Sequence, residues 1–153
     1  MKTKWKSLLV ALGVPLAVGG LAALLSGGMR DYGVMAKPPL SPPGWVFPVV
    51  WSALYLLMGF ASWLVWRSDA PEKKRALSLY AAQLIANFIW PLLFFGGEWY
   101  LAALLWLVLL WVLILLTIRA FSVISERAGD LLIPYILWVS FAAYLNLGIY
   151  LLN

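Results

Sequence analysis

The sequence contains no cysteine and no histidine. Without cysteine the chain can form no disulfide, and it has neither a thiol nucleophile nor a thiolate metal ligand. Without histidine it lacks the side chain that most often acts as a general base or binds a metal near neutral pH. Serine-histidine triads, histidine-ligated zinc hydrolases and histidine-ligated haem are therefore excluded, and we expect no metal site.

Charged residues are also scarce. They make up 11% of the 153 residues, whereas soluble globular proteins carry about 25%. In contrast, 65% of the residues are hydrophobic, 16% are aromatic, and the mean hydropathy is +0.94. This composition indicates a chain surrounded by lipid. The net charge of +5 does not point to nucleic acid, because the basic residues flank apolar runs and form no continuous stripe.

Five charge-free runs divide the chain, at 7–29, 38–66, 76–97, 99–118 and 131–153. A helix needs roughly 20 residues to cross a hydrocarbon core of about 30 Å, and each run is long enough. The second run begins with PPLSPP, whose prolines lack amide donors, so its helix should start near Gly44. We therefore predict an all-α integral membrane protein with a single domain over 1–153 and helices at about 7–27, 44–66, 76–95, 99–118 and 131–151.

Lysine and arginine are unevenly distributed between the two ends of such a bundle. Most precede the first helix or lie in the second and fourth connections, and only Arg30 and Lys37 lie in the long first loop. Cytoplasmic loops carry an excess of these residues. We therefore expect a cytoplasmic amino terminus, and we favour a bacterial cell membrane because the loops are short and no targeting segment is recognisable.

No carboxylate lies inside an expected helix, since all six acidic residues fall in loops or at helix ends. Ion-coupled transport and hydrolytic acid-base chemistry rely on such groups, so neither is favoured. The deep polar side chains are amides and indoles at helical spacing. They form two faces, Gln83, Asn87 and Trp90 on the third helix and Trp138, Ala142 and Asn146 on the fifth. These groups either hydrogen-bond between helices or line a ligand cavity.

The ten tryptophans are the strongest compositional feature. Those near the span ends, Trp5, Trp63, Trp66 and Trp99, fit an interfacial belt. Trp106 and Trp111 are expected to pack or to face lipid. In the second helix Trp51 and Tyr55 share a face, so together with Trp90 and Trp138 they would line one aromatic cavity for flat apolar ligands.

Prolines and small residues shape the expected packing. Pro15 and Pro91 lie deep in their spans and should bend the helices, which makes room between them. Small residues allow close contact between helices, and a homodimer is therefore expected. These residues are Gly13, Ala17 and Gly20 in the first helix and Ala82 and Ala86 in the third.

Three stretches carry a family resemblance. They are KPPLSPPGWVFPVVWSALYLLMG at 37–59, NFIWPLLFF at 87–95 and LLIPYILWVSFAAYLNLGIYLLN at 131–153. The chain resembles the translocator protein (TspO/MBR) family, the tryptophan-rich sensory proteins formerly called peripheral-type benzodiazepine receptors. The resemblance implies a five-helix bundle, commonly dimeric, that binds tetrapyrroles such as protoporphyrin IX and haem, sterols, and benzodiazepine-type ligands.

The resemblance also implies a set of ligand-binding residues. Tyr32, Pro42 and Pro43 match the lid loop, while Trp51, Asn87, Trp90, Trp138, Ala142 and Leu145 match the cavity. Two positions depart from the family pattern. Leu40 stands where the family usually has tryptophan, and no lysine or arginine follows Tyr144 or Tyr150, so a sterol ligand is disfavoured.

Three functions follow as alternatives. The leading one is a non-catalytic membrane receptor or carrier for tetrapyrroles, with no required cofactor. Arg30 and Lys37 would either meet ligand carboxylates or only solvate the loop and contact lipid headgroups. The second is light-dependent oxidative degradation of bound protoporphyrin IX, in which Trp51 and Trp138 would be the redox-active groups. The third is a stress-sensing scaffold whose cytoplasmic contacts would come from 73–75 or the fourth loop.

Overall fold

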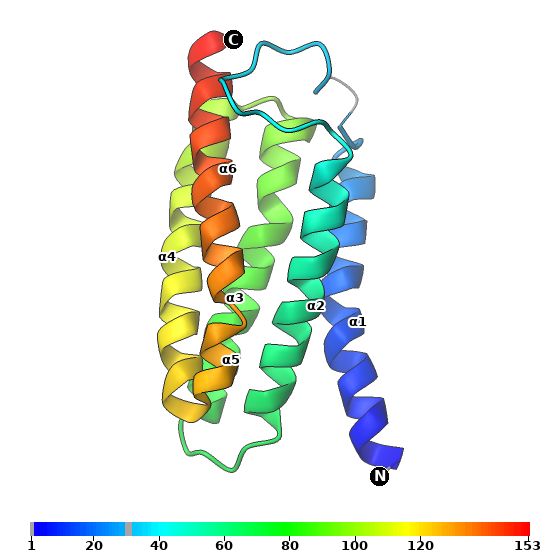
Figure 1. Ribbon diagram of the computed structural model, residues 1–153, viewed down its shortest axis with the longest axis vertical. Coiled ribbons are helices and arrows are strands. Elements are labelled where there is room, and N and C mark those ends of the chain that lie inside the picture. Colours follow the sequence, from blue (N-terminus) through cyan, green and yellow to red (C-terminus); the bar gives the residue numbers. More distant parts are fainter. Residues whose placement is uncertain (1, 30–31) are drawn as a thin grey trace.

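The structure of the protein is a computed structural model that describes residues 2–29 and 32–153 (Figure 1). Regular structure in these ranges is helical, and five helical segments are long and apolar enough to cross a membrane. The predicted all-α five-helix membrane bundle is therefore confirmed. The elements are α1 (Lys2–Leu25), α2 (Val46–Trp66), α3 (Lys73–Pro91), the π-helical turn η1 (Leu92–Gly96), α4 (Tyr100–Ile124), α5 (Glu126–Asp130) and α6 (Ile133–Leu152).

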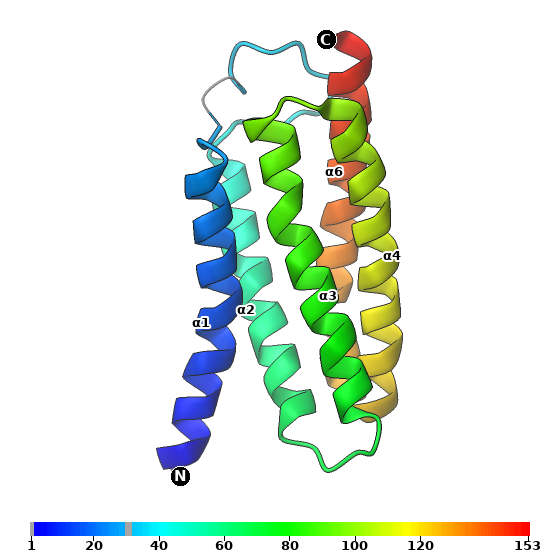
Figure 2. The same ribbon diagram turned by 180° about the vertical axis from the view of Figure 1, so that it is seen from behind.

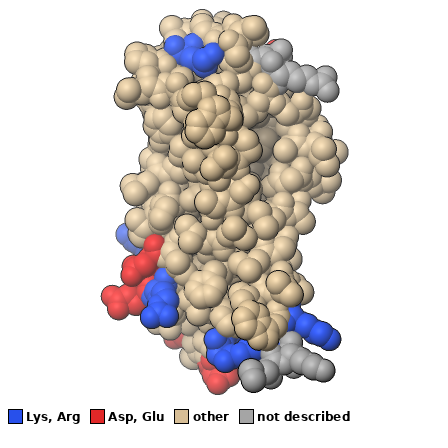
Figure 3. All heavy atoms as spheres, turned by 45° about the vertical axis from the view of Figure 1, so that its right-hand side comes forward, with Lys and Arg blue, Asp and Glu red and all other residues tan. Residues whose placement is uncertain are grey.

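The long helices run side by side along the longest axis of the molecule. The start of α1, the α2–α3 connection and α5 lie at one end, and the first loop, the α3–α4 connection and the carboxyl end of α6 lie at the other (Figures 1 and 2). Most charged side chains on the face in Figure 3 gather at the former end, which we call the basic end, below a broad uncharged band. This division of the loops is the one that the distribution of lysine and arginine predicts.

The fourth connection differs from the loop expected at 119–130. Helix α4 continues to Ile124, and α5 then forms a short helix of its own. Ser125 separates the two with an extended backbone, and its hydroxyl accepts a hydrogen bond from the amide of Ala128 at 3.3 Å. A serine at this position caps a new helix, here α5. The charged residues that mark the end of the apolar run therefore do not end α4, which continues to the serine.

Helix α1 packs against α2 and α3, α3 packs against α4, and α4 packs against α6. Helices α1 and α2 approach each other closely at Gly59, where an added Cβ would lie 2.5 Å from the carbonyl oxygen of Ala11 and 2.8 Å from the Cα of Leu12. Only glycine therefore fits there. Helix α1 is the least buried of the five spans. Only 11% of the residues in its most apolar stretch are buried, whereas the share in the other spans is 33 to 44%. Helix α1 therefore covers one side of the bundle and leaves its own outer face open.

Candidate functional site

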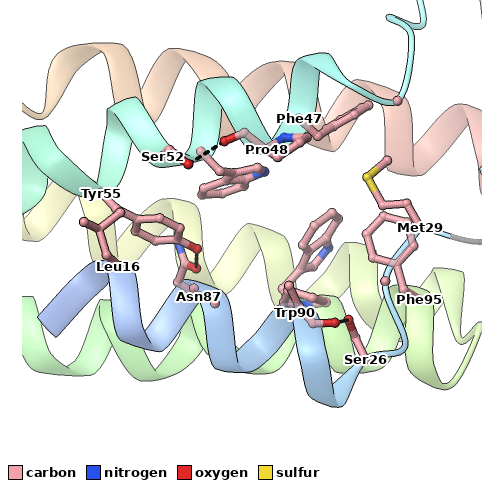
Figure 4. A pocket seen from close by; sticks show the side chains of 17 residues that line it. Leu16, Ser26, Met29, Phe47, Pro48, Ser52, Tyr55, Asn87, Trp90 and Phe95 are labelled. Atoms are coloured by element: carbon pink, nitrogen blue, oxygen red, sulfur yellow. Dashed lines mark hydrogen bonds between the residues drawn. The ribbon is translucent and has the colours of Figure 1, made fainter. Parts of the chain in front are cut away.

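A cavity of about 510 Å³ lies between α1, α2 and α3, in the half of the bundle nearest the first loop. Helix α2 contributes Phe47, Trp51 and Tyr55, and Trp90 and Phe95 come from α3 and η1 (Figure 4). On the third side α1 presents mainly small residues and the loop after it adds Met29. The cavity, which we call the aromatic slot, is thus lined by aromatic rings and closed on one side by a helix face of mainly small residues.

Small residues in α1 determine how closely its neighbours approach. The ring of Tyr55 packs directly against Gly19, in space that a Cβ at this position would fill. Gly20 has no atom within 4 Å of the place where its Cβ would lie. Gly19 therefore fixes the position of the Tyr55 ring, while Gly20 leaves space for an occupant.

A chain of buried hydrogen bonds leads from the cavity into the bundle. The Tyr55 hydroxyl donates to Asn87 Oδ1 at 2.8 Å, and Asn87 Nδ2 donates to the Tyr135 hydroxyl at 2.7 Å. Tyr135 in turn donates to Gln83 Oε1 at 2.7 Å. The chain joins α2, α3 and α6, and Tyr55 and Asn87 also line the cavity.

Of the deep amides, Asn87 fits both interpretations, whereas Gln83 and Asn146 only form hydrogen bonds within the bundle. Asn87 bonds between helices and lines the cavity, whereas Gln83 is 1% exposed and bonds within the bundle. Asn146 accepts from the indole of Trp90 at 3.1 Å and donates to the carbonyl of Tyr100 at 2.9 Å. Trp90 thus has its N–H directed into the bundle, so it offers the cavity its ring and not its donor.

The structure brings four of the predicted site residues together at the cavity, namely Trp51, Tyr55, Asn87 and Trp90. Trp138, Ala142 and Leu145 of α6 do not line it. An aromatic layer explains the separation, because Phe47 packs edge-on against Trp138 (5.7 Å between ring centres) and Trp51 packs edge-on against Tyr135 (6.2 Å). The indole N–H of Trp138 is buried behind this layer and has no hydrogen-bond partner among the described residues.

The first loop lines the cavity through Gly28, Met29 and Gly44, and Tyr32 packs against the lining residue Phe47. This ring packs edge-on against Phe47 at 5.1 Å, and its hydroxyl donates to the carbonyl oxygen of Pro42 at 2.6 Å. Burial raises the pKa of Tyr32, so the hydroxyl keeps the proton that it donates. The carbonyl of Pro43 accepts from the amide of Val46 at 3.1 Å and starts α2. These three predicted residues therefore shape the loop, and none of them lines the cavity.

Of the two basic residues expected to meet ligand carboxylates, the structure describes only Lys37. Lys37 Nζ donates to the carbonyls of Tyr32 (2.7 Å) and Met35 (3.2 Å) and lies 4.8 Å from the centre of the Tyr32 ring. These contacts hold the first loop together. Arg30 lies outside the described residues. Leu40, at the position that departs from the family pattern, is 83% exposed with φ of +70°.

Several tryptophans have roles that the sequence did not reveal. Trp63, expected in the interfacial belt, is instead 8% exposed and donates to the Ser7 hydroxyl of α1 at 3.0 Å. Trp106 donates to the carbonyl of Ala86 at 2.8 Å, and Trp111 donates to the Ser140 hydroxyl at 2.9 Å. Trp5, Trp66 and Trp99 are more than half exposed, as expected for the belt.

Sequence reasoning also missed the part of the cavity that α1 forms. Gly19, Gly20 and Ala23 line it, whereas small residues at such spacing predict only a surface for helix contact. Phe47 and Phe95 were missed as well, because an apolar ring in an apolar span carries no signal of its own. Two sequence features point to this region, namely the run Gly19-Gly20 and the deep prolines Pro15 and Pro91, of which Pro91 lines the cavity.

The lining residues determine what the cavity can do chemically. None of those described is charged, and the polar groups are hydroxyls, an amide and indoles. No group of three or more histidine, cysteine or carboxylate side chains that would hold a metal occurs among the described residues. Such a site suits a flat apolar ligand that stacks on rings, with any ionised group left outside.

Comparison with known proteins gives consistent results over nearly the whole chain. The TspO/MBR family model matches residues 11–152. The chain is 40% identical over 153 residues to the tryptophan-rich protein TspO of Chlorobaculum tepidum, covering 96% of both chains. It is 37% identical over 145 residues to the tryptophan-rich sensory protein of Cereibacter sphaeroides, covering 95% of this chain and 88% of the relative. It is 40% identical over 122 residues to the translocator protein of Ovis aries, covering 78% and 72%.

Proposed function

The chain belongs to the TspO/MBR family, and from this premise we propose that it is a membrane receptor or carrier that binds a tetrapyrrole, such as protoporphyrin IX or haem, in the cavity between α1, α2 and α3. The observation that carries the proposal is the uncharged aromatic slot formed by Phe47, Trp51, Tyr55 and Trp90. A volume of about 510 Å³ lies within the range of small-molecule sites.

The fit between ligand and site rests on the separation of apolar and charged parts. A porphyrin ring is flat and apolar and stacks well on indole and phenol rings. Its propionates carry charge, and a carboxylate transferred into an uncharged cavity pays a large desolvation cost. The ring would therefore enter the slot and leave its propionates at the mouth, near the first loop that Tyr32 and Lys37 hold.

A dark titration with protoporphyrin IX tests this proposal. Purified protein in detergent is titrated and the porphyrin absorbance is followed, with empty micelles as the partitioning control. Trp51→Leu removes a stacking ring and should weaken binding about two- to tenfold. Ala23→Trp adds bulk to the lining and should weaken it further, while Trp99→Phe alters a tryptophan that is 64% exposed and should change nothing.

Two results would reject the proposal. One is absorbance that rises without saturation to the same extent in empty micelles. The other is a saturable titration that neither Trp51→Leu nor Ala23→Trp alters, because the ligand would then occupy another place.

A second candidate function is light-dependent oxidative degradation of bound protoporphyrin IX. It is favoured by the Trp51 indole, which lines the cavity and stacks on Tyr55 with 5.6 Å between ring centres. Illumination of the saturated complex under air should then produce a new product with the parent protein and much less with Trp51→Phe. Equal rates of loss in both proteins would reject it. Trp138 lies one aromatic layer away and is the second residue to test in the same way.

We further propose that the protein lies in a bacterial cell membrane with its amino terminus in the cytoplasm and that it forms a homodimer. The orientation follows from the basic end, which would face the cytoplasm. The dimer is supported by Gly13 and Ala17 on α1, both of which are exposed, and an added Cβ at Gly13 would meet no atom within 4 Å. A second copy would find there a surface of small residues that suits close helix packing.

A further inference from the structure

A second cavity, of about 470 Å³, lies between the same three helices at the basic end. It is lined by residues 6–14 of α1, by the last turns of α2 and by the first turns of α3, and it shares no lining residue with the aromatic slot. The close approach of α1 to α2 at Gly59 falls between the two along α2. The second cavity is therefore a separate site.

One cation lines this cavity, and two more contact residues that line it. Lys6 is exposed and lines it directly. Arg67 lies with its guanidinium 4.5 Å from the centre of the Trp63 ring, and Lys73 Nζ donates to the carbonyl of Trp66 at 3.1 Å. Both tryptophans line the cavity. None of the three cations forms an ion pair with a carboxylate of the described residues, so their charge is available to an anion.

The interior of the cavity is apolar except at its inner side. Val10, Val14 and Leu77 form apolar parts of the lining. Tyr80 also lines it, and its hydroxyl, on a side chain only 8% exposed, makes no hydrogen bond of good geometry with the described residues. The hydroxyl of its neighbour Ser62 lies near that of Tyr80 and donates its own proton to the carbonyl of Gly59 at 2.8 Å. A buried hydroxyl without a partner costs free energy, and an acceptor brought by a ligand would remove that cost.

We infer that this cavity binds one anionic phospholipid, with its phosphate at Lys6, Arg67 and Lys73 and an acyl chain along Val10 and Val14. The lipid ester carbonyl would accept the hydrogen bond that Tyr80 has available. Charge complementarity selects an anionic headgroup, and basic pockets between membrane helices recognise such lipids.

Native mass spectrometry of the full chain tests the inference. The protein is exchanged into detergent containing dioleoyl phosphatidylglycerol or dioleoyl phosphatidylcholine, which differ only in the headgroup, and the retained lipid adducts are counted. We expect one phosphatidylglycerol to be retained at ratios where phosphatidylcholine is not. Removal of one cation, in Lys6→Gln, should reduce this preference about fivefold, and Lys6→Arg should preserve it.

Matched controls separate the site from the general charge of this end. Arg127→Gln removes an exposed cation of α5 at the same end that does not line the cavity, and should leave retention unchanged. Leu77→Trp fills part of the cavity without changing the charge of the protein, and it should reduce retention of phosphatidylglycerol. Tyr80→Phe removes the hydroxyl without changing the shape of the cavity, and it should also reduce retention. Neither change should alter porphyrin binding in the other cavity.

Three outcomes would overturn the inference. Equal losses in Lys6→Gln and Arg127→Gln would mean that adducts report net charge alone. Equal retention of both lipids would remove the headgroup specificity. Displacement of the lipid by glycerol phosphate without acyl chains would mean that the cavity is a site for a free anion.

Discussion

The close approach of α1 to α2 at Gly59 gives the sharpest prediction about stability. An alanine there would place its Cβ 2.5 Å from the Ala11 carbonyl oxygen and 2.8 Å from the Leu12 Cα. These are backbone atoms of a helix, which cannot move aside as the end of a flexible side chain can. Gly59→Ala therefore forces the two helices apart.

The size of the effect follows from two opposing contributions. Alanine in place of glycine inside a helix is favourable by about 0.5 to 1 kcal/mol. Overpacking of a tight contact costs about 1 to 3 kcal/mol. The control Gly20→Ala makes the same chemical change in α1, where no atom lies within 4 Å of the new Cβ. The difference between the two variants thus isolates the steric contribution, which we expect to be about 1 to 3 kcal/mol.

The assay is reversible unfolding in mixed detergent micelles, followed by tryptophan fluorescence, with the free energy of unfolding compared among the parent protein, Gly59→Ala and Gly20→Ala. The reasoning predicts that Gly59→Ala is the least stable of the three. If Gly59→Ala were as stable as Gly20→Ala, the two helices would not lie in contact at this position, and the division between the two cavities would lose its basis.

Three further predictions concern other contacts. Asn87→Leu removes two interhelical hydrogen bonds and should lower the free energy of unfolding by about 1 to 3 kcal/mol; a change below about 0.5 kcal/mol in the micelle assay would contradict that role. The ring of Pro38 packs on Gly148, so Gly148→Val should displace Pro38. Hydrogen exchange should then rise in the first loop while the buried helices stay protected. Unchanged exchange in the loop would show that α6 does not hold the loop in place. Gly13→Leu combined with Ala17→Leu should shift the purified protein from dimer to monomer in light scattering, and an unchanged mass would exclude this face as the interface.

The sequence alone was sufficient for the number, order and approximate position of the membrane helices. Charged residues are costly in a bilayer and mark the ends of spans, and a lone span must satisfy its backbone polar groups as a helix. The same reasoning misplaced the end of α4, because a capping serine and not a charge ends that helix. Residues at helical spacing, such as Trp51 with Tyr55 and Asn87 with Trp90, were correctly placed on shared faces because spacing along one helix is a local property.

Only the tertiary structure decided which faces meet. Trp51 and Trp138 were expected to line one cavity, yet Phe47 packs against Trp138, and no pattern along either helix records that layer. The contribution of α1 to both cavities likewise depends on how far Gly19 and Gly59 let its neighbours approach. In an apolar chain the periodic signal identifies helices but distinguishes poorly between a face toward lipid and a face toward another helix, because lipid and protein interior are equally apolar. Side-chain shape at a few glycines and rings makes that choice, and it acts only once the helices are packed.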